Sequence, residues 1–259
     1  MGYLVHQVRL FFIALQFFTR LPIPRWVGFE PQWLQHAARY FPLVGLLVAA
    51  VAALVYYAAC SLWPAPVAVL LSTAAGIYLT GAFHEDGFAD MCDGFGGGMS
   101  RERVMEIMKD SRIGTYGAVG AGLLLALKCV LLSALPPASA VAALLIAHPL
   151  SRFAATSLIW QLDYARDEGK AKPMAQHMTT GEFITAGVCA LAPLLAAGVL
   201  TPSAWPQLGA ALLATAGATI WLGAKFVRRI GGYTGDCLGA VQQVSEVAIY
   251  LCLAAALAQ

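Results

Sequence analysis

Residues 40–63 read YFPLVGLLVAAVAALVYYAACSLW and contain no Asp, Glu, Lys, Arg or His. A transmembrane helix needs about 20 mostly apolar residues, so this stretch is long enough to cross a bilayer. The rest of the chain has a similar character, since 59% of its residues are hydrophobic and 12% are charged. A soluble domain typically contains about 25% charged residues. The sequence therefore predicts an all-α, polytopic integral membrane protein whose main partner is the lipid bilayer.

Six further stretches resemble residues 40–63, which gives an expectation of about seven transmembrane helices. They lie near residues 65–83, 116–135, 138–160, 183–203, 207–227 and 238–258. Charges within three of them leave six or eight spans as alternatives.

A shorter apolar run near the N-terminus lies between Arg9 and Arg20. It lacks a small-residue cleavage pattern, so we expect no signal peptide. We expect residues 3–20 to form a helix in the membrane interface, with an additional span as the alternative. Residues 1–259 are treated as one membrane-embedded domain, in which residues 1–39 form a cytoplasmic or interfacial segment.

The connections between the expected spans differ in charge on the two faces. Three short connections, around residues 64, 136–137 and 203–206, contain proline and no charged residue. The opposite face carries Arg20, Arg25, Arg39, Arg101, Arg103, Lys109, Arg112, Arg166, Lys170, Lys172, Arg228 and Arg229. By the positive-inside rule this second face is cytoplasmic, which predicts a bacterial inner-membrane protein with its active face in the cytoplasm. No basic stripe with interleaved aromatic residues indicates nucleic-acid binding.

An acidic motif follows the second expected span, where residues 84–98 read HEDGFADMCDGFGGG. Asp86, Asp90 and Asp93 have the spacing i, i+4, i+7, so they share one face if the span continues as a helix. Carboxylates about 5–6 Å apart repel one another unless a cation lies between them. Hard oxygen ligands select Mg²⁺, Mn²⁺ or Ca²⁺ over zinc. The motif therefore predicts a metal site in residues 84–115, with a solvated acidic turn as the alternative.

Residues 101–112, RERVMEIMKDSR, have the pattern of a short amphipathic helix close to the acidic motif. Its apolar side comprises Val104, Ile107 and Met108. Lys109 and Arg112 are positioned to bind phosphate oxygens bridged by the metal. Asp110 is a candidate metal ligand or general base.

Several ionisable residues fall within expected spans. His148 and Arg152 lie in the fourth, where an arginine costs about 2.5–3.5 kcal/mol, so Arg152 needs a partner or a polar cavity. Snorkelling of Arg152 to the cytoplasmic interface is the alternative. Lys128 is a candidate partner for a buried carboxylate, and Glu246 should face the protein interior.

The last cytoplasmic turn, residues 231–240, reads GGYTGDCLGA. A glycine-rich backbone can approach a phosphate closely. Asp236 stands where the last helix should begin and could be a ligand, a base or a helix cap.

Together these motifs resemble the cobalamin synthase family, the adenosylcobinamide-GDP ribazoletransferases. The resemblance rests on residues 84–94, 106–115 and 231–240, on the FTRLPIP stretch at 18–24, and on the Tyr-Ala-Arg at 164–166. It covers most of the chain, with its motifs in order.

The resemblance implies a Mg²⁺-dependent membrane enzyme that completes the nucleotide loop of vitamin B12. Such an enzyme joins adenosylcobinamide-GDP to α-ribazole or its 5′-phosphate and releases GMP. It implies metal ligands at Asp86, Asp90 and Asp93, phosphate contacts at Lys109, Arg112 and Arg152, and a proton acceptor at Asp110 or Asp236. It adds His84, Thr234 and Gly235 as substrate-binding residues, with Glu85 as an accessory candidate. A homo-oligomer, or an association with other nucleotide-loop enzymes, is compatible with the sequence.

Two other interpretations compete. A CDP-alcohol phosphotransferase also carries aspartates along membrane helices, but it has an Ala-Arg pair where this chain has Phe-Ala-Asp. The later aspartate pair of that family is also missing from this chain, because no Asp lies between Asp110 and Asp163. A transporter is suggested by the ionisable residues within spans, but it should show repeated halves, which the sequence lacks.

Overall fold

The computed structural model describes residues 2–165 and 178–255. Within these ranges the chain is helical and forms no strand, apart from an isolated bridge between Tyr164 and Tyr233. Arg166, Lys170 and Lys172 of the predicted cytoplasmic face lie outside the described residues, as do residues 256–258 of the last expected span.

Six helical segments of the described chain are long and apolar enough to cross a membrane, or seven if a bent pair counts as one span. The first is α3, Phe41–Cys60, which continues α2, Pro31–Ala37, through the short 3-10 turn η2, Ala38–Tyr40. The others are α7, Thr115–Ala134; α8, Pro137–Gln161; α9, Thr180–Leu200; α10, Trp205–Ile230, preceded by η4, Pro202–Ala204; and α11, Gly235–Ala255. The predicted all-α bundle of about seven spans is confirmed.

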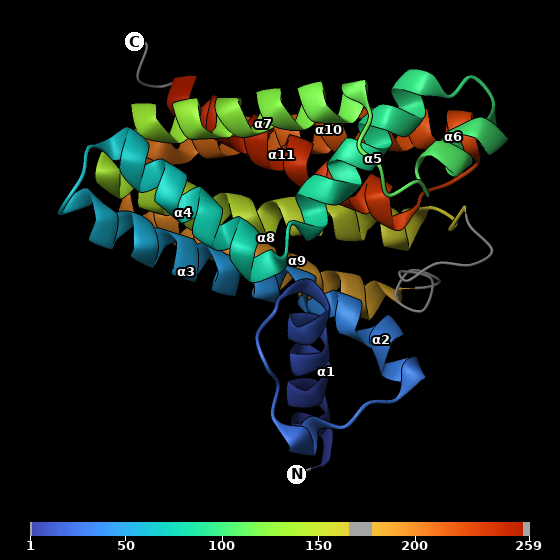
Figure 1. The fold of residues 1–259 in the computed structure, drawn as a ribbon. Coiled ribbons are helices and arrows are strands. Elements are labelled where there is room, and N and C mark those ends of the chain that lie inside the picture. The colour runs from blue at the N-terminus through green and yellow to red at the C-terminus, as the bar shows by residue number, and fades with distance from the viewer. Residues whose placement is uncertain (1, 166–177, 256–259) are drawn as a thin grey trace.

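The second expected span does not run straight into the acidic motif. α4, Ala65–Thr80, covers most of this span, and α5, Phe83–Gly97, which carries the motif, meets α4 at an angle of 88°. Gly81 (φ 66°) and Ala82 (φ 59°) form the corner in the left-handed region, which costs a non-glycine residue such as Ala82 about 1–2 kcal/mol. The assumption of one continuous helix is therefore wrong, because the chain turns sharply before the first aspartate (Figure 1).

The N-terminal helix α1, Gly2–Phe18, runs crosswise to the bundle (Figure 1), as expected for a helix in the interface. Its C-terminal end is anchored where the Arg20 N–H donates to the Leu79 carbonyl at 2.9 Å. The turn η1, Arg25–Val27, then leads to α2.

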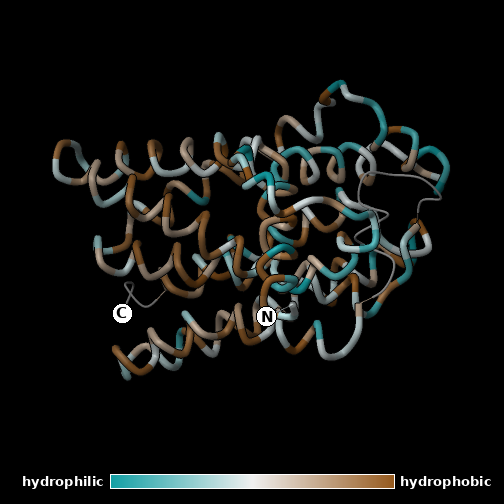
Figure 2. The backbone as a smooth tube through the Cα atoms, turned by 90° about the horizontal axis from the view of Figure 1, so that it is seen from below, coloured by the Kyte–Doolittle hydropathy of each residue, from teal (hydrophilic) through white to brown (hydrophobic). Residues whose placement is uncertain are grey.

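Polar residues gather at one end of the bundle, whereas the opposite end is mostly hydrophobic (Figure 2). The polar end holds α5, the short helix α6, Arg101–Ile107, and the turn between α10 and α11. Val104 and Met108 are buried and Ile107 is partly buried, so the predicted apolar side of α6 is confirmed. α11 lies inside the bundle, packed against α5, α7, α8 and α10.

Candidate functional site

The acidic helix and the glycine-rich turn meet where α5 crosses the start of α11. A Cβ atom on Gly87 would lie 3.0 Å from the Asp236 Cα, and one on Gly239 would lie 3.1 Å from the His84 carbonyl oxygen. A side chain at either position would require the facing backbone to move by a few tenths of an ångström, so glycine suits this close approach. The crossing brings together two motifs that are far apart in the sequence and places Asp236 against the acidic helix.

The three aspartates of α5 differ in their surroundings. Asp86 is exposed, Asp90 is partly exposed and Asp93 is 9% exposed. The Gly114 N–H donates to Asp93 Oδ2 at 2.7 Å, and the Gly117 N–H donates to Asp93 Oδ1 at 2.8 Å. A carboxylate at this position satisfies unpaired N–H groups of α7 and complements the helix dipole. Asp93 therefore ties the α6–α7 connection to α5.

The fit of these residues to a metal depends mainly on Asp86 and Asp90. Within the described residues, no group of three or more His, Cys, Asp or Glu side chains could by itself hold a metal ion. Mg²⁺ usually binds through one or two carboxylates together with water and substrate phosphates. Asp86 and Asp90, one helical turn apart, fit that mode of binding. The three-aspartate site stays a prediction.

The connection after α6 carries Lys109, Asp110 and Arg112. Lys109 is exposed, and the Arg112 side chain, 87% exposed, pairs with Asp110 at 2.7 Å. Its Nε also donates to Asp110 Oδ1 at 3.0 Å. Hydrogen bonds from Arg112 lower the pKa of Asp110 to about 2. A carboxylate of such low pKa is a weak base at neutral pH. The choice between Asp110 and Asp236 as proton acceptor stays a prediction.

The turn before α11 is fixed by backbone and side-chain contacts. The Tyr233 N–H donates to the Asp163 carbonyl at 3.0 Å, and the Ala165 N–H donates to the Tyr233 carbonyl at 2.8 Å. Thr234 is fully buried, and its Oγ1 accepts from the Cys237 N–H at 3.3 Å, which is the geometry of an N-cap. Thr234 therefore supports the helix start, while Gly235 and Asp236 are partly exposed beside it.

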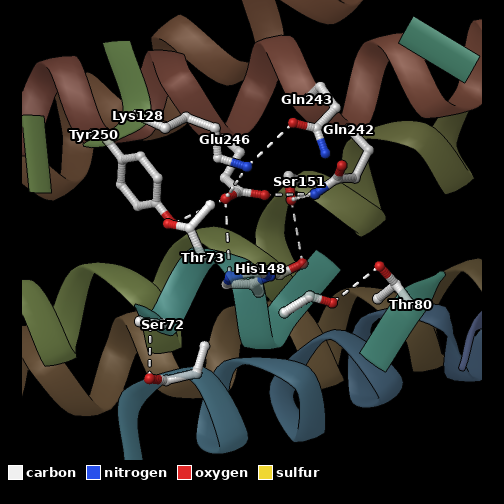
Figure 3. Close-up of polar contacts among 12 residues, drawn as sticks. Ser72, Thr73, Thr80, Lys128, His148, Ser151, Gln242, Gln243, Glu246 and Tyr250 are labelled. Carbon is white, nitrogen blue, oxygen red and sulfur yellow. Dashed lines mark hydrogen bonds and ion pairs between the residues drawn. The ribbon is translucent and has the colours of Figure 1, made fainter. Parts of the chain in front are cut away.

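A buried ionic network lies among α7, α8 and α11 (Figure 3). Glu246, 1% exposed, pairs with Lys128 at 2.7 Å and accepts from the Tyr250 hydroxyl at 3.0 Å. It also accepts from Gln242 Nε2 at 2.7 Å, and His148 Nε2 lies 3.8 Å away. The expectations that Lys128 pairs with a buried carboxylate and that Glu246 faces the interior are confirmed.

The network reaches α5 through Gln243. Lys128 donates to Gln243 Oε1 at 3.1 Å, and Gln243 Nε2 donates to Glu85 Oε1 at 2.9 Å. Glu85 is thus part of the network. The amide and phenol members of the network were missed by the sequence analysis, because neutral polar residues within a span carry no charge signal.

Arg152 also lies within the bundle. It is 3% exposed, and its Nη1 contacts His148 Nδ1 at 3.3 Å and the His148 carbonyl oxygen at 3.0 Å. Snorkelling of Arg152 is therefore wrong, and the structure separates it from the exposed Lys109 and Arg112. His84, 4% exposed, is buried as well.

A polar cavity of about 30 Å³ adjoins this network, with His84, Glu85 and Arg152 in its wall. One water occupies at least about 10–15 Å³ on such a measure, so the cavity has room for about two waters.

The helical bundle and its polar end define a polytopic membrane protein with many of its polar residues gathered at one end. No solved structure matches the chain, so its fold cannot be compared with a protein of known structure. The chain belongs to the cobalamin-5-phosphate synthase family, which it matches over residues 10–254.

Three relatives support the assignment, each described as an adenosylcobinamide-GDP ribazoletransferase. The protein of Leptothrix cholodnii is 51% identical over 97% of both chains. That of Ralstonia pickettii is 49% identical over 91% of both. That of Shewanella frigidimarina is 46% identical over 97% of this chain and 96% of its own.

Proposed function

We propose that this protein joins adenosylcobinamide-GDP to α-ribazole, or to α-ribazole 5′-phosphate, and releases GMP. The product is adenosylcobalamin or its 5′-phosphate. The observation that carries the proposal is the near full-length identity to ribazoletransferases. It is supported by the α5–α11 crossing, which joins the motifs on which the family resemblance rests.

The reaction replaces one phosphorus–oxygen bond by another. A ribose hydroxyl of α-ribazole attacks the phosphorus that is attached to cobinamide, and the bridging oxygen leaves with GMP. Asp236 takes the hydroxyl proton and passes it to solvent. Such transfers depend on positioning and on charge neutralisation more than on covalent catalysis.

Lys109 and Arg112 bind non-bridging oxygens of the diphosphate, because both are exposed on the connection that Asp93 ties to α5 and carry flexible cationic side chains. Asp93 holds their loop in place through the amides of Gly114 and Gly117. Asp86 and Asp90 would hold Mg²⁺, and the ion would supply neutralisation of the diphosphate charge.

The reaction is assayed with purified protein in detergent, supplied with adenosylcobinamide-GDP, α-ribazole and Mg²⁺. Equal amounts of GMP and of the cobalamin product are expected, and no GMP when α-ribazole is omitted. The isosteric variant Asp236→Asn should lose most of the activity while inserting normally. Absence of GMP from the wild-type protein would refute the proposed function, and release of CMP from a CDP-alcohol would support the competing class.

We further propose that the polar end faces the cytoplasm of a bacterial inner membrane. The distribution of arginine and lysine supports this orientation. A reporter fused after Gly98 or after Arg229 should lie in the cytoplasm, and one near Pro137 should lie outside. Residues 84–115 on the outer side would overturn the orientation.

A further inference from the structure

A groove of about 460 Å³ lies between α8 and α10. Its volume falls within the range of small-molecule sites, about 300–1,000 Å³. One wall is a face of α10 that runs from Thr219 to Arg228, which at 1.5 Å per residue is about 13 Å long. The other wall is the end of α8, where Leu158, Gln161 and Leu162 line the groove.

The walls are apolar over most of their length, and both helices are long and apolar enough to cross a membrane. Ile220 and Val227 of α10 are 72% and 45% exposed, so this face of α10 is open to the surroundings of the bundle. Gly223 and Ala224, which lie between them, have little or no side chain and leave the groove wide. In a membrane span such a surface faces lipid, and an acyl chain is the apolar ligand that the bilayer supplies.

One end of the groove carries a cation that has no partner within the described residues. Arg228, in the last turn of α10, is exposed and makes no hydrogen bond, ion pair or ring contact with any of them. The basic residues on either side of it are engaged with α5. Lys225 lies 5.5 Å from the ring centre of Phe95, and Arg229 Nη2 donates to the Gly98 carbonyl. Arg228 is thus the basic residue of this helix end that is left for a ligand in the groove.

A phospholipid matches both parts of the groove. Its phosphate lies at the membrane interface next to its acyl chains, and an arginine binds phosphate oxygens through paired N–H donors. None of the described residues that line the groove is acidic, so an ammonium headgroup would find no partner there. Gln161 Nε2 donates to the Ser157 carbonyl at 3.2 Å, which leaves the Gln161 amide oxygen for a hydroxyl donor. The lining therefore favours an anionic headgroup that carries hydroxyls over a zwitterionic one.

We infer that the groove between α8 and α10 binds one anionic phospholipid, with an acyl chain along α10 and the phosphate on Arg228. The inference depends on insertion into the membrane and not on the proposed reaction. Arg228 is three residues before Gly231, where the glycine-rich turn begins. The lipid therefore stabilises the helix end from which this turn starts.

The test measures the lipid that stays with the purified full-length protein. The protein in mild detergent is incubated with equal amounts of phosphatidylglycerol and phosphatidylethanolamine, and bound lipid is counted by native mass spectrometry. The wild type should retain phosphatidylglycerol in preference, at about one molecule per chain. Arg228→Gln should retain about fivefold less, the effect of one basic residue near a lipid headgroup. Arg25→Gln, which removes an exposed basic residue outside the groove, should stay within twofold of the wild type.

A second pair of variants tests the apolar part without changing charge. Ala224→Leu fills the groove and should lower retention of phosphatidylglycerol at least about fivefold. Ala216→Leu adds the same side chain at an exposed position of α10 outside the groove and should stay within twofold. Added phosphatidylglycerol should raise the melting temperature of the wild type and of Ala216→Leu, but not that of Arg228→Gln or Ala224→Leu.

Equal retention of the two lipids by the wild type would overturn the site, as would equal losses in Arg228→Gln and Arg25→Gln, because both indicate bulk attraction only. A wild-type dimer that Ala224→Leu dissociates would assign the groove to a second copy of the chain and would likewise overturn it. The proposed function is judged separately, by GMP release from the wild-type protein.

Discussion

Replacement of Asp93 by Asn tests whether this residue anchors a loop or binds a metal. In the structure its two carboxylate oxygens accept the N–H groups of Gly114 and Gly117 at 2.7 and 2.8 Å. Asn keeps the volume and one acceptor oxygen, but it turns its NH₂ group toward the other amide. The loop that carries Lys109 and Arg112 should therefore detach from α5 more often.

The size of the effect follows from these two contacts. A hydrogen bond to a charged group contributes about 1.5–3 kcal/mol. Asp93→Asn removes one such bond and reduces the other to a neutral bond, a loss of about 3 kcal/mol. Each 1.4 kcal/mol is a factor of ten, so the balance between docked and detached loop shifts by roughly 100-fold.

The assay is GMP release measured against adenosylcobinamide-GDP and, separately, against Mg²⁺. If Asp93 is an anchor, the KM for adenosylcobinamide-GDP should rise at least about tenfold, and the Mg²⁺ concentration for half-maximal activity should not change. Glu106→Gln is the matched control. Glu106 is an exposed acid paired with Arg103 at 2.7 Å, and such a pair contributes less than about 1 kcal/mol. A raised Mg²⁺ requirement with an unchanged KM at saturating Mg²⁺ would identify Asp93 as a metal ligand and refute the anchor.

Three further predictions concern the metal, the exposed ion pair and the buried network. Asp90→Asn should insert at normal levels, release almost no GMP at ordinary Mg²⁺ and recover only at raised metal; full activity in chelator-treated membranes would exclude a metal at this residue. Because Arg112 lowers the Asp110 pKa from 3.8 to about 2, the stabilisation from this pair is present above pH 3.8 and is lost as the pH falls through 2. Arg112→Ala should move the Asp110 titration, followed by carboxyl NMR, back toward 3.8 and raise the KM for adenosylcobinamide-GDP but not for α-ribazole; an unmoved titration contradicts the pairing. Glu246→Gln leaves the buried Lys128 ammonium without its carboxylate partner, so thermal unfolding in detergent should show a loss of about 3–5 kcal/mol, partly restored by adding Lys128→Met. Wild-type stability of Glu246→Gln would mean that the pair contributes little.

The sequence by itself determined the class of fold and the position of most charges. Apolar runs such as residues 40–63 can be recognised as membrane spans from the sequence alone. The free energy of transferring a side chain into hydrocarbon depends on its own chemistry and hardly on its neighbours. The sequence alone also predicted that Glu246 faces the protein interior, because an unpaired charge within a span cannot face lipid. The motifs of α5 and α11 could be recognised for the same reason, as they are contiguous.

Only the tertiary structure decided which of these residues meet. The spacing of Asp86, Asp90 and Asp93 is that of one helical face, but the 88° corner at Gly81 and Ala82 determines what that face meets. It directs Asp93 to the amides that begin α7. Helix spacing gives the relative direction of side chains within a helix and says nothing of how the helix is rotated against its neighbours.

The same reason separates Arg152 from Arg112, which the sequence analysis had grouped by charge. The rotation of α8 buries Arg152 beside His148, whereas Arg112 lies on an exposed loop. The edge-to-face contacts of Phe18 with Phe41 and Phe83 were likewise outside the reach of sequence reasoning. Phe18, Phe41 and Phe83 come from three separate helices, and ordinary apolar residues give no local sign of which ones will face a shared space. Long-range packing, which no short stretch of this sequence encodes, brings them together around Arg152.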